Sequence, residues 1–194
     1  MLTYEQALTR IVKTTPSPRV ARVALHDTLG LVLAQRIIAP LDLPPFDNSA
    51  VDGYAVCLPE DCGEPSKSAS VSLNIAGCSS AGLPYEGIVR PGEAVRIFTG
   101  AVVPRGADRI IMQEQVSRHG DRISFERWPD IGRNMRRRGE DLRRGTHVLE
   151  AGTQLRPQEI GLLAALGYRD VSVYSTPTVA ILTTGDELQR PGVA

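Results

Sequence analysis

Aromatic residues are scarce in this 194-residue sequence, at 5% of the chain, and long apolar runs are missing. No run approaches the roughly 20 apolar residues that a membrane-spanning helix requires, so we expect no membrane association. The N-terminus, MLTYEQALTR, contains an acidic residue and lacks the apolar core of a secretory signal. With 42% hydrophobic and 23% charged residues, the composition is that of a globular protein. The sequence therefore predicts a cytoplasmic protein.

Cysteine is scarce, and there is no excess of charge of one sign. Cys57, Cys62 and Cys78 are an odd number, and no second cluster or histidine pair lies nearby to complete a zinc site, so we expect free thiols. The 22 basic residues are balanced by 22 acidic ones. Because no whole-protein field would attract nucleic acid, any site for an anion must be local.

Two short helices are predicted from capping signals. Thr3 followed by Gln6 has the form of a capping box, and the apolar residues after it predict a helix over about 4–14. Pro157 is typical of a helix start and Gly167 of a helix end, with apolar residues between them.

Extended structure is predicted for much of the remaining chain. Residues 23–38 should begin as a short helix and become extended, since Gly30 and later β-branched residues interrupt the helical pattern. From 44 to about 141, glycine and proline recur between short apolar runs, which predicts a compact all-β unit, a small barrel or sandwich. The runs are VSLNIA, AVRIFTGA, RIIMQEQV and RISFERW.

Two further apolar runs, at 171–174 and 178–182, also predict strands. The second, TVAIL, leads directly into the polar residues 184–187. Such a run is typical of a strand buried in a parallel sheet, and α/β sheets bind ligands at the carboxyl ends of their strands. No crossover helix or further strand follows it in this sequence. We therefore expect the first strand of an α/β domain over 177–194.

Several polar stretches could carry chemistry. Asp52 belongs to a polar turn, and Thr99 with Gly100 could offer a hydroxyl and a bare amide to an anion. By themselves, both stretches are more typical of turns that satisfy their own backbone. The arginines between 133 and 144 suit an oxyanion, because guanidinium groups bind phosphate bidentately. A solvated basic face would look the same, whereas interspersed acids and the lack of stacking aromatics argue against nucleic acid.

Four stretches, in order, resemble the molybdopterin molybdenumtransferase family, the MoeA type that includes the C-terminal domain of gephyrin. They are PPFDNSAVDGYAV (44–56), RIFTGAVVPRGADRIIMQEQV (96–116), GRNMRRRGEDL (132–142) and ILTTGDEL (181–188). The resemblance implies a transferase of molybdenum cofactor biosynthesis, which inserts molybdate into adenylylated molybdopterin and releases AMP with the help of Mg²⁺. The family is longer on its C-terminal side, so we expect this chain to be an incomplete part of the enzyme and inactive alone.

The resemblance also implies which residues form the site. Catalytic roles fall on Asp52, Thr99, Asp141 and Glu187. Substrate contacts fall on Ser49, Gly100, Arg136, Arg137, Thr184, Gly185 and Asp186. The carboxylates of Asp52, Asp141 and Asp186 are the candidate Mg²⁺ ligands, since this ion prefers hard oxygen donors.

The implied architecture is an α+β multidomain protein. Residues 1–45 and 142–176 would form an elongated helical and extended dimerisation domain, 46–141 an inserted small β-barrel-like domain, and 177–194 the start of a pterin-binding α/β domain. The active site would lie between the β domain of one protomer and the pterin domain of the other. We therefore expect a homodimer, with molybdopterin adenylyltransferase as its partner in the pathway. The alternatives are a dimerising scaffold and an anion-binding module without catalysis.

Overall fold

The structure of the protein is a computed structural model that describes residues 2–57, 71–127, 129–189 and 192. The chain folds as two compact units. The terminal unit contains Met1–Ile37 and His147–Ala194, and the central unit is Ile38–Thr146. The sequence placed these boundaries a few residues further inside the β region and made 177–194 a separate part. Among the described residues, no helix has the length and apolar character needed to cross a membrane.

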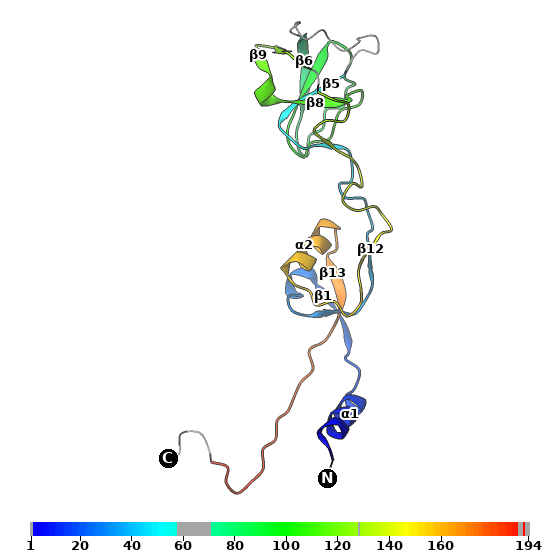
Figure 1. The fold of residues 1–194 in the computed structure, drawn as a ribbon, viewed down its shortest axis with the longest axis vertical. Helices are drawn as coiled ribbons and strands as arrows, with labels where there is room; N and C mark the ends of the chain where they lie inside the picture. Colours follow the sequence, from blue (N-terminus) through cyan, green and yellow to red (C-terminus); the bar gives the residue numbers. More distant parts are fainter. Residues whose placement is uncertain (1, 58–70, 128, 190–191, 193–194) are drawn as a thin grey trace. The chain divides into compact units, whose positions relative to one another are not determined.

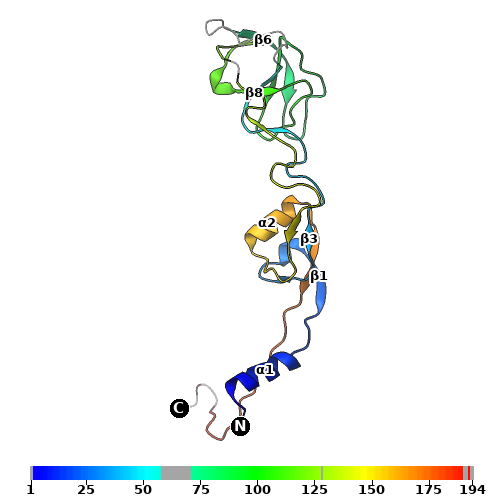
Figure 2. The ribbon, with the colours of Figure 1, turned by 45° about the vertical axis from the view of Figure 1, so that its right-hand side comes forward.

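The terminal unit is built on a three-stranded antiparallel sheet in the order β1-β13-β2 (Figures 1 and 2). Helix α2 packs on this sheet, because its Leu163 shares a buried cluster with Val171 and Val173 of the central strand. A two-stranded pairing of β3 with β12 completes the strands of this part. The elements are α1 (Tyr4–Thr14), β1 (Val20–Ala24), η1 (Leu25–Asp27), β2 (Val32–Leu33), β3 (Ile37–Ile38), β12 (His147–Leu149), α2 (Pro157–Ala165) and β13 (Asp170–Tyr174).

Both predicted helices are confirmed with their caps. The Thr3 hydroxyl accepts from the amide of Gln6, whose side chain accepts from the amide of Thr3. Pro157 begins α2, and Gly167 follows its end at a φ of 82°. A left-handed residue at that place lets the chain leave the helix while the last carbonyls stay hydrogen-bonded.

Helix α1 is amphipathic, but none of its residues is buried. Leu8, Ile11 and Val12 lie three and four positions apart, so they form one apolar face, and their exposed fractions are 48%, 61% and 67%. Figure 2 shows the helix standing at the end of its unit rather than against the sheet. Among the described residues, therefore, none buries this apolar face.

Two expectations for the terminal unit are wrong. The helix expected at the start of 23–38 is a single 3₁₀ turn, η1, because β1 already occupies the chain up to Ala24. The strand expected over 178–182 is irregular and exposed, with Leu182 90% accessible. Among the described residues no strand pairs with this run, and an apolar β-branched sequence cannot form a strand without a partner for its backbone.

The central unit is a six-stranded sheet in the order β8-β5-β7-β6-β10-β9. The sheet is a half-barrel whose edge strands β8 and β9 do not pair with each other, so the expected small barrel or sandwich is confirmed only in part. Figure 1 shows these strands gathered in one unit. A short pairing of β4 with β11 lies beside it. The elements are β4 (Asn48–Ser49), β5 (Gly53–Val56), β6 (Val71–Ser79), β7 (Glu93–Ile97), β8 (Arg109–Met112), η2 (Gln113–Gln115), β9 (Ser117–His119), β10 (Arg122–Phe125) and β11 (Met135–Arg136).

Each of the four apolar runs of the expected β unit contains a strand, namely β6, β7, β8 and β10. Alternate side chains of β5 enter different clusters: Tyr54 and Val56 pack with Ile111 and Ile123, whereas Ala55 packs with Ile97. This alternation is the period-two pattern of a strand covered on both faces. Of the expected free thiols, Cys78 is free and exposed, and Cys62 lies outside the described residues.

Candidate functional site

Asp52 and Thr99 face each other in the central unit. Asp52 immediately precedes β5, and Thr99 follows β7, the neighbouring strand. The backbone amide and the hydroxyl of Thr99 both donate to Oδ1 of Asp52, each at 2.8 Å. These two hydrogen bonds, the amide first, hold the pKa of Asp52 below its ordinary value, with a smaller contribution from the charge of Arg96. Asp52 is therefore an anion whose other oxygen, Oδ2, has no described protein partner.

The backbone beside Asp52 is held by a close approach of two strands. Gly53 pairs with Met112 across β5 and β8, and a Cβ at Gly53 would overlap the carbonyl oxygen of Ile111. The carbonyl of Asp52 also accepts from the amide of Gln113 at 3.0 Å. Only glycine allows this approach, which sets the place of the Asp52 carboxylate relative to the sheet.

Ser49 and Gly100 lie next to this pair, but their polar groups are engaged within the turn. The hydroxyl of Ser49, only 1% exposed, donates to the carbonyl of Val51 at 2.5 Å and accepts from the Val51 amide. The amide of Gly100 donates to the carbonyl of Ser49 at 2.8 Å. Both residues shape the turn that presents Asp52 and Thr99, which is the arrangement expected of self-satisfied loops.

Three arginines of the arginine-rich stretch are paired with carboxylates. Arg137 and Asp47, 90 positions apart in sequence, lie 2.6 Å from each other, and neither was paired with the other by the sequence pattern. Two further arginines form ion pairs, also with a nitrogen–oxygen distance of 2.6 Å. The three pairs are Arg136 with Asp141, Arg137 with Asp47 and Arg138 with Asp42.

Backbone amides strengthen the same contacts. Asp47 accepts from the amide of Arg138, and Asp42 accepts from the amide of Arg144, both at 2.8 Å. The amide of Arg138 and then the Arg137 side chain lower the pKa of Asp47. For Asp42, the amide of Arg144 and the Arg138 side chain lower the pKa in the same way. These carboxylates stay ionised and tie the segment after β11 to the one before β4.

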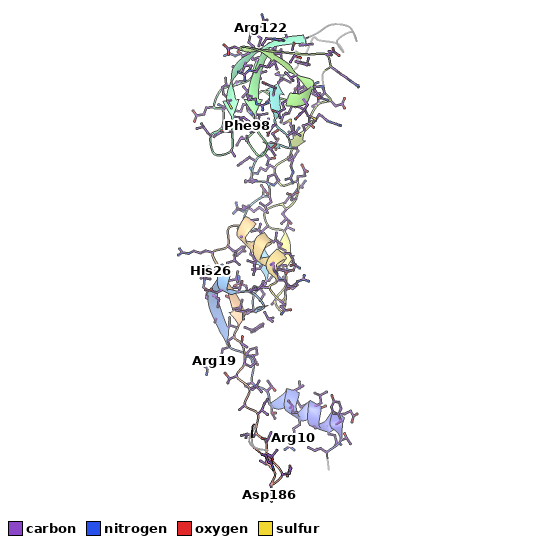
Figure 3. The ribbon with its side chains drawn as sticks, turned by 90° about the vertical axis from the view of Figure 1, so that its left-hand side faces the viewer. Arg10, Arg19, His26, Phe98, Arg122 and Asp186 are labelled. Carbon is purple, nitrogen blue, oxygen red and sulfur yellow. The ribbon has the colours of Figure 1, made fainter. Side chains whose placement is uncertain are left out.

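The fourth candidate stretch lies in the terminal unit. Thr184, Gly185, Asp186 and Glu187 are all exposed on the irregular segment that follows β13, where Figure 3 labels Asp186. A hydrogen bond from the amide of Leu188 to the carbonyl of Gly185 makes one turn there. Four of the catalytic and substrate candidates, by contrast, gather around one turn of the central unit: Ser49, Asp52, Thr99 and Gly100.

The carboxylates of Asp52 and Asp141 differ in what they could offer a cation. Both oxygens of Asp141 lie 2.6 Å from Nη2 of Arg136, and this contact raises the pKa of Arg136, so Asp141 is committed to an ion pair. Asp52 keeps its negative charge, and its Oδ2 oxygen accepts no hydrogen bond from a described residue. Within the described ranges, no group of three or more acidic, histidine or cysteine residues is placed to hold a metal.

A cavity of about 660 Å³ opens elsewhere in the central unit. It lies beside β8, β9 and β10, and of the candidate arginine stretch only Arg133 lines it, whereas Asp52, Thr99 and Asp141 do not. Its walls mix both charges, including Glu114, Glu126, Arg127 and Arg133.

Comparison with known proteins decides the family. The sequence profile described as "MoeA N-terminal region (domain I and II)" matches residues 2–167. The chain belongs to this family. A molybdopterin molybdenumtransferase of Haemophilus influenzae is 42% identical over 194 residues, 99% of this chain and 46% of that protein. One from Nostoc is 42% identical over 159 residues, 82% of this chain and 36% of that protein.

Solved structures agree with the sequences. The crystal structure of a molybdopterin biosynthesis moeA protein from Pyrococcus horikoshii matches with a TM-score of 0.80 and 36% identity, covering 91% of this chain and 47% of that one. This MoeA-family chain thus spans about half the length of the curated relatives it matches.

Proposed function

We propose that this chain supplies the N-terminal part of a molybdopterin molybdenumtransferase, which inserts molybdate into adenylylated molybdopterin and releases AMP. The observation that carries the proposal is the hydrogen-bonded pair of Asp52 and Thr99, which two neighbouring strands bring together. Over 99% of its own length, this chain is 42% identical to such an enzyme. The proposal extends to the expectation that the chain alone is inactive, with the remaining catalytic groups supplied by the rest of the enzyme.

Asp52 would act at the phosphate end of the substrate. A carboxylate repels a phosphate, so its use there requires a cation between the two, and Mg²⁺ commonly binds one or two carboxylates together with substrate phosphate oxygens. Oδ2 of Asp52 would hold Mg²⁺, which would neutralise charge on the phosphoanhydride. Thr99 holds Oδ1, so the carboxylate keeps one orientation.

The test uses an extended protein, in which this chain is followed by the part of the Haemophilus influenzae relative that it does not cover. AMP release is followed with adenylylated molybdopterin, molybdate and Mg²⁺. We expect release by the extended protein, none by this chain alone, and a loss of roughly 100-fold for Asp52→Asn. Asp121→Asn is the matched control, because Asp121 is exposed in the same unit and has no described side-chain contact. An extended protein whose AMP release survives Asp52→Asn would refute the role of Asp52.

The exposed apolar face of α1 supports a homodimer as part of the proposal. Leu8, Ile11 and Val12 leave an apolar surface that water disfavours, and a second copy of the chain would bury it. We expect a dimer in analytical ultracentrifugation at micromolar concentration. Ile11→Glu should give a monomer, whereas Thr9→Glu, which adds the same charge outside this face, should not. A dimer that forms while the extended protein releases no AMP would favour the scaffold function instead.

A further inference from the structure

Arg96 differs from the other arginines near the site. Arg136, Arg137 and Arg138 each have a carboxylate partner, whereas no carboxylate among the described residues forms an ion pair with Arg96. Its guanidinium carbon lies 5.0 Å from the ring centre of Tyr54 and 4.8 Å from that of Phe98. Attraction between a cation and aromatic faces stabilises the charge in place of an acid.

The strand geometry explains these two ring contacts. Tyr54 lies directly across from Arg96 in the β5–β7 register, and Phe98 is two residues further along, on the same side as Arg96. The intervening Ile97 points the other way into a buried cluster. Tyr54 is itself only 4% exposed, so the guanidinium rests on a rigid surface, while Phe98 lies next to Thr99.

The nitrogens of the Arg96 guanidinium donate hydrogen bonds to two neighbouring segments of the chain. Nη1 donates to the carbonyl of Gly53 at 3.3 Å, and Nη2 donates to the side chain of Gln113 at 2.5 Å. Gly53 follows Asp52 directly, and the amide of Gln113 donates to the carbonyl of Asp52. Arg96 therefore contacts the residue after Asp52, the residue before Thr99 and the residue that holds the Asp52 backbone.

We propose that Arg96 is a positioning residue. By joining the segments that contain Gly53, Phe98 and Gln113, it keeps the carboxylate of Asp52 aligned with the amide and hydroxyl of Thr99. The consequence for AMP release rests on the proposed function, whereas the positioning itself does not. The planar guanidinium group is suited to this role, since it can donate hydrogen bonds in two directions while its faces stack on aromatic rings. Lysine could keep the charge but not the two fixed directions.

The first experiment measures the geometry in the full 194-residue chain by NMR. The amide of Thr99 donates to Oδ1 of Asp52, so its rate of hydrogen exchange at one fixed pH reports whether this hydrogen bond is kept. In the unmodified chain we expect this amide to be protected from exchange. Arg96→Gln should remove this protection. Arg122→Gln, the loss of an exposed arginine of β10 that Figure 3 labels, should leave it unchanged.

Two further variants separate positioning from charge and from misfolding. Arg96→Lys should resemble Arg96→Gln, because the planar guanidinium group is lost in both. Gln113→Ala leaves Arg96 and its aromatic contacts in place, removes one anchor, and should give a smaller change of the same kind. If the Thr99 amide in Arg96→Lys and Gln113→Ala is as protected from exchange as in the unmodified chain, Arg96 does not position the pair and the proposal is overturned.

The second experiment measures AMP release in the extended protein. Arg96→Lys should lower kcat about tenfold with KM near its original value, because a displaced reacting group costs rate rather than binding. An unchanged kcat would overturn the catalytic consequence of positioning. If the unmodified extended protein releases no AMP, the proposed function fails, and the NMR experiment still decides the role of Arg96.

Discussion

A methyl group at Gly53 would disturb the strand pairing beside Asp52. The Cβ of an alanine there would overlap the carbonyl oxygen of Ile111 and lie 3.0 Å from its carbonyl carbon and 3.1 Å from Cγ2 of Ile110. None of these atoms is the end of a flexible side chain free to turn away, since Ile110 and Ile111 are fully buried. β8 would have to move from β5, which weakens the ladder between Gly53 and Met112.

The loss of stability expected for Gly53→Ala can be estimated from the cost of overpacking a protein interior. Forcing an extra methyl into a packed interior costs typically 1–3 kcal/mol, and a backbone contact puts Gly53→Ala near the upper end, at about 3 kcal/mol. For a domain of roughly 100 residues, each kcal/mol shifts Tm by about 4–8 °C, so the central unit should melt about 12–24 °C lower. Calorimetry of the full chain, with amide exchange of the β5 and β8 peptides to identify the unit, measures this.

Gly161→Ala is the control for the substitution itself. Gly161 lies inside α2 with nothing within 4 Å of the added Cβ, so alanine should stabilise the terminal unit by about 1 kcal/mol through helix propensity. The two variants should thus have opposite signs. A Gly53→Ala chain that melts with the unmodified one, and keeps its exchange protection in β5 and β8, would show that the strands do not approach this closely.

Two smaller changes test the surroundings. Ser49→Ala should lower the free energy of unfolding by about 1–2 kcal/mol in urea, because the partly buried Val51 carbonyl loses its donor. No change would mean that the hydroxyl is not engaged in the turn. The Arg156 side chain lowers the pKa of Glu159 to about 2, so the ionised carboxylate stabilises the terminal unit above the ordinary pKa of glutamate, and this is lost as pH falls toward 2. Glu159→Gln should flatten the stability profile between about pH 4.5 and 2, and an unaltered acid melting profile would contradict the pairing.

Local signals in the sequence predicted local structure well. The capping box at Thr3 and Gln6 and the Pro157 to Gly167 span each need only residues within a few positions, and both helices form where expected. The β runs were found for the same reason. The strand over 178–182 failed, since strand formation depends on a partner that no window of the sequence contains.

The sequence predicted which residues belong to the candidate site but not which of them contact each other. Asp52 and Thr99 were both named, yet their hydrogen bonds depend on β5 lying beside β7, a non-local pairing. The partners of Arg137 and Arg138 were missed because they lie 90 and 96 positions away, at Asp47 and Asp42. Arg96 was hidden inside a strand, although its alternation with Phe98 on one face was a readable signal.

The distribution of charge changes what the arginine stretch can do. Arg136, Arg137 and Arg138 are saturated by carboxylates, so their attraction for a phosphate or molybdate is largely cancelled. The guanidinium groups of Arg143 and Arg144 form no ion pair within the described part of the chain. If an oxyanion approaches this end of the central unit, these two arginines, rather than the three before them, retain the charge to attract it. Asp52, held ionised, would still repel that anion, which is the physical reason why a cation belongs in the proposed reaction.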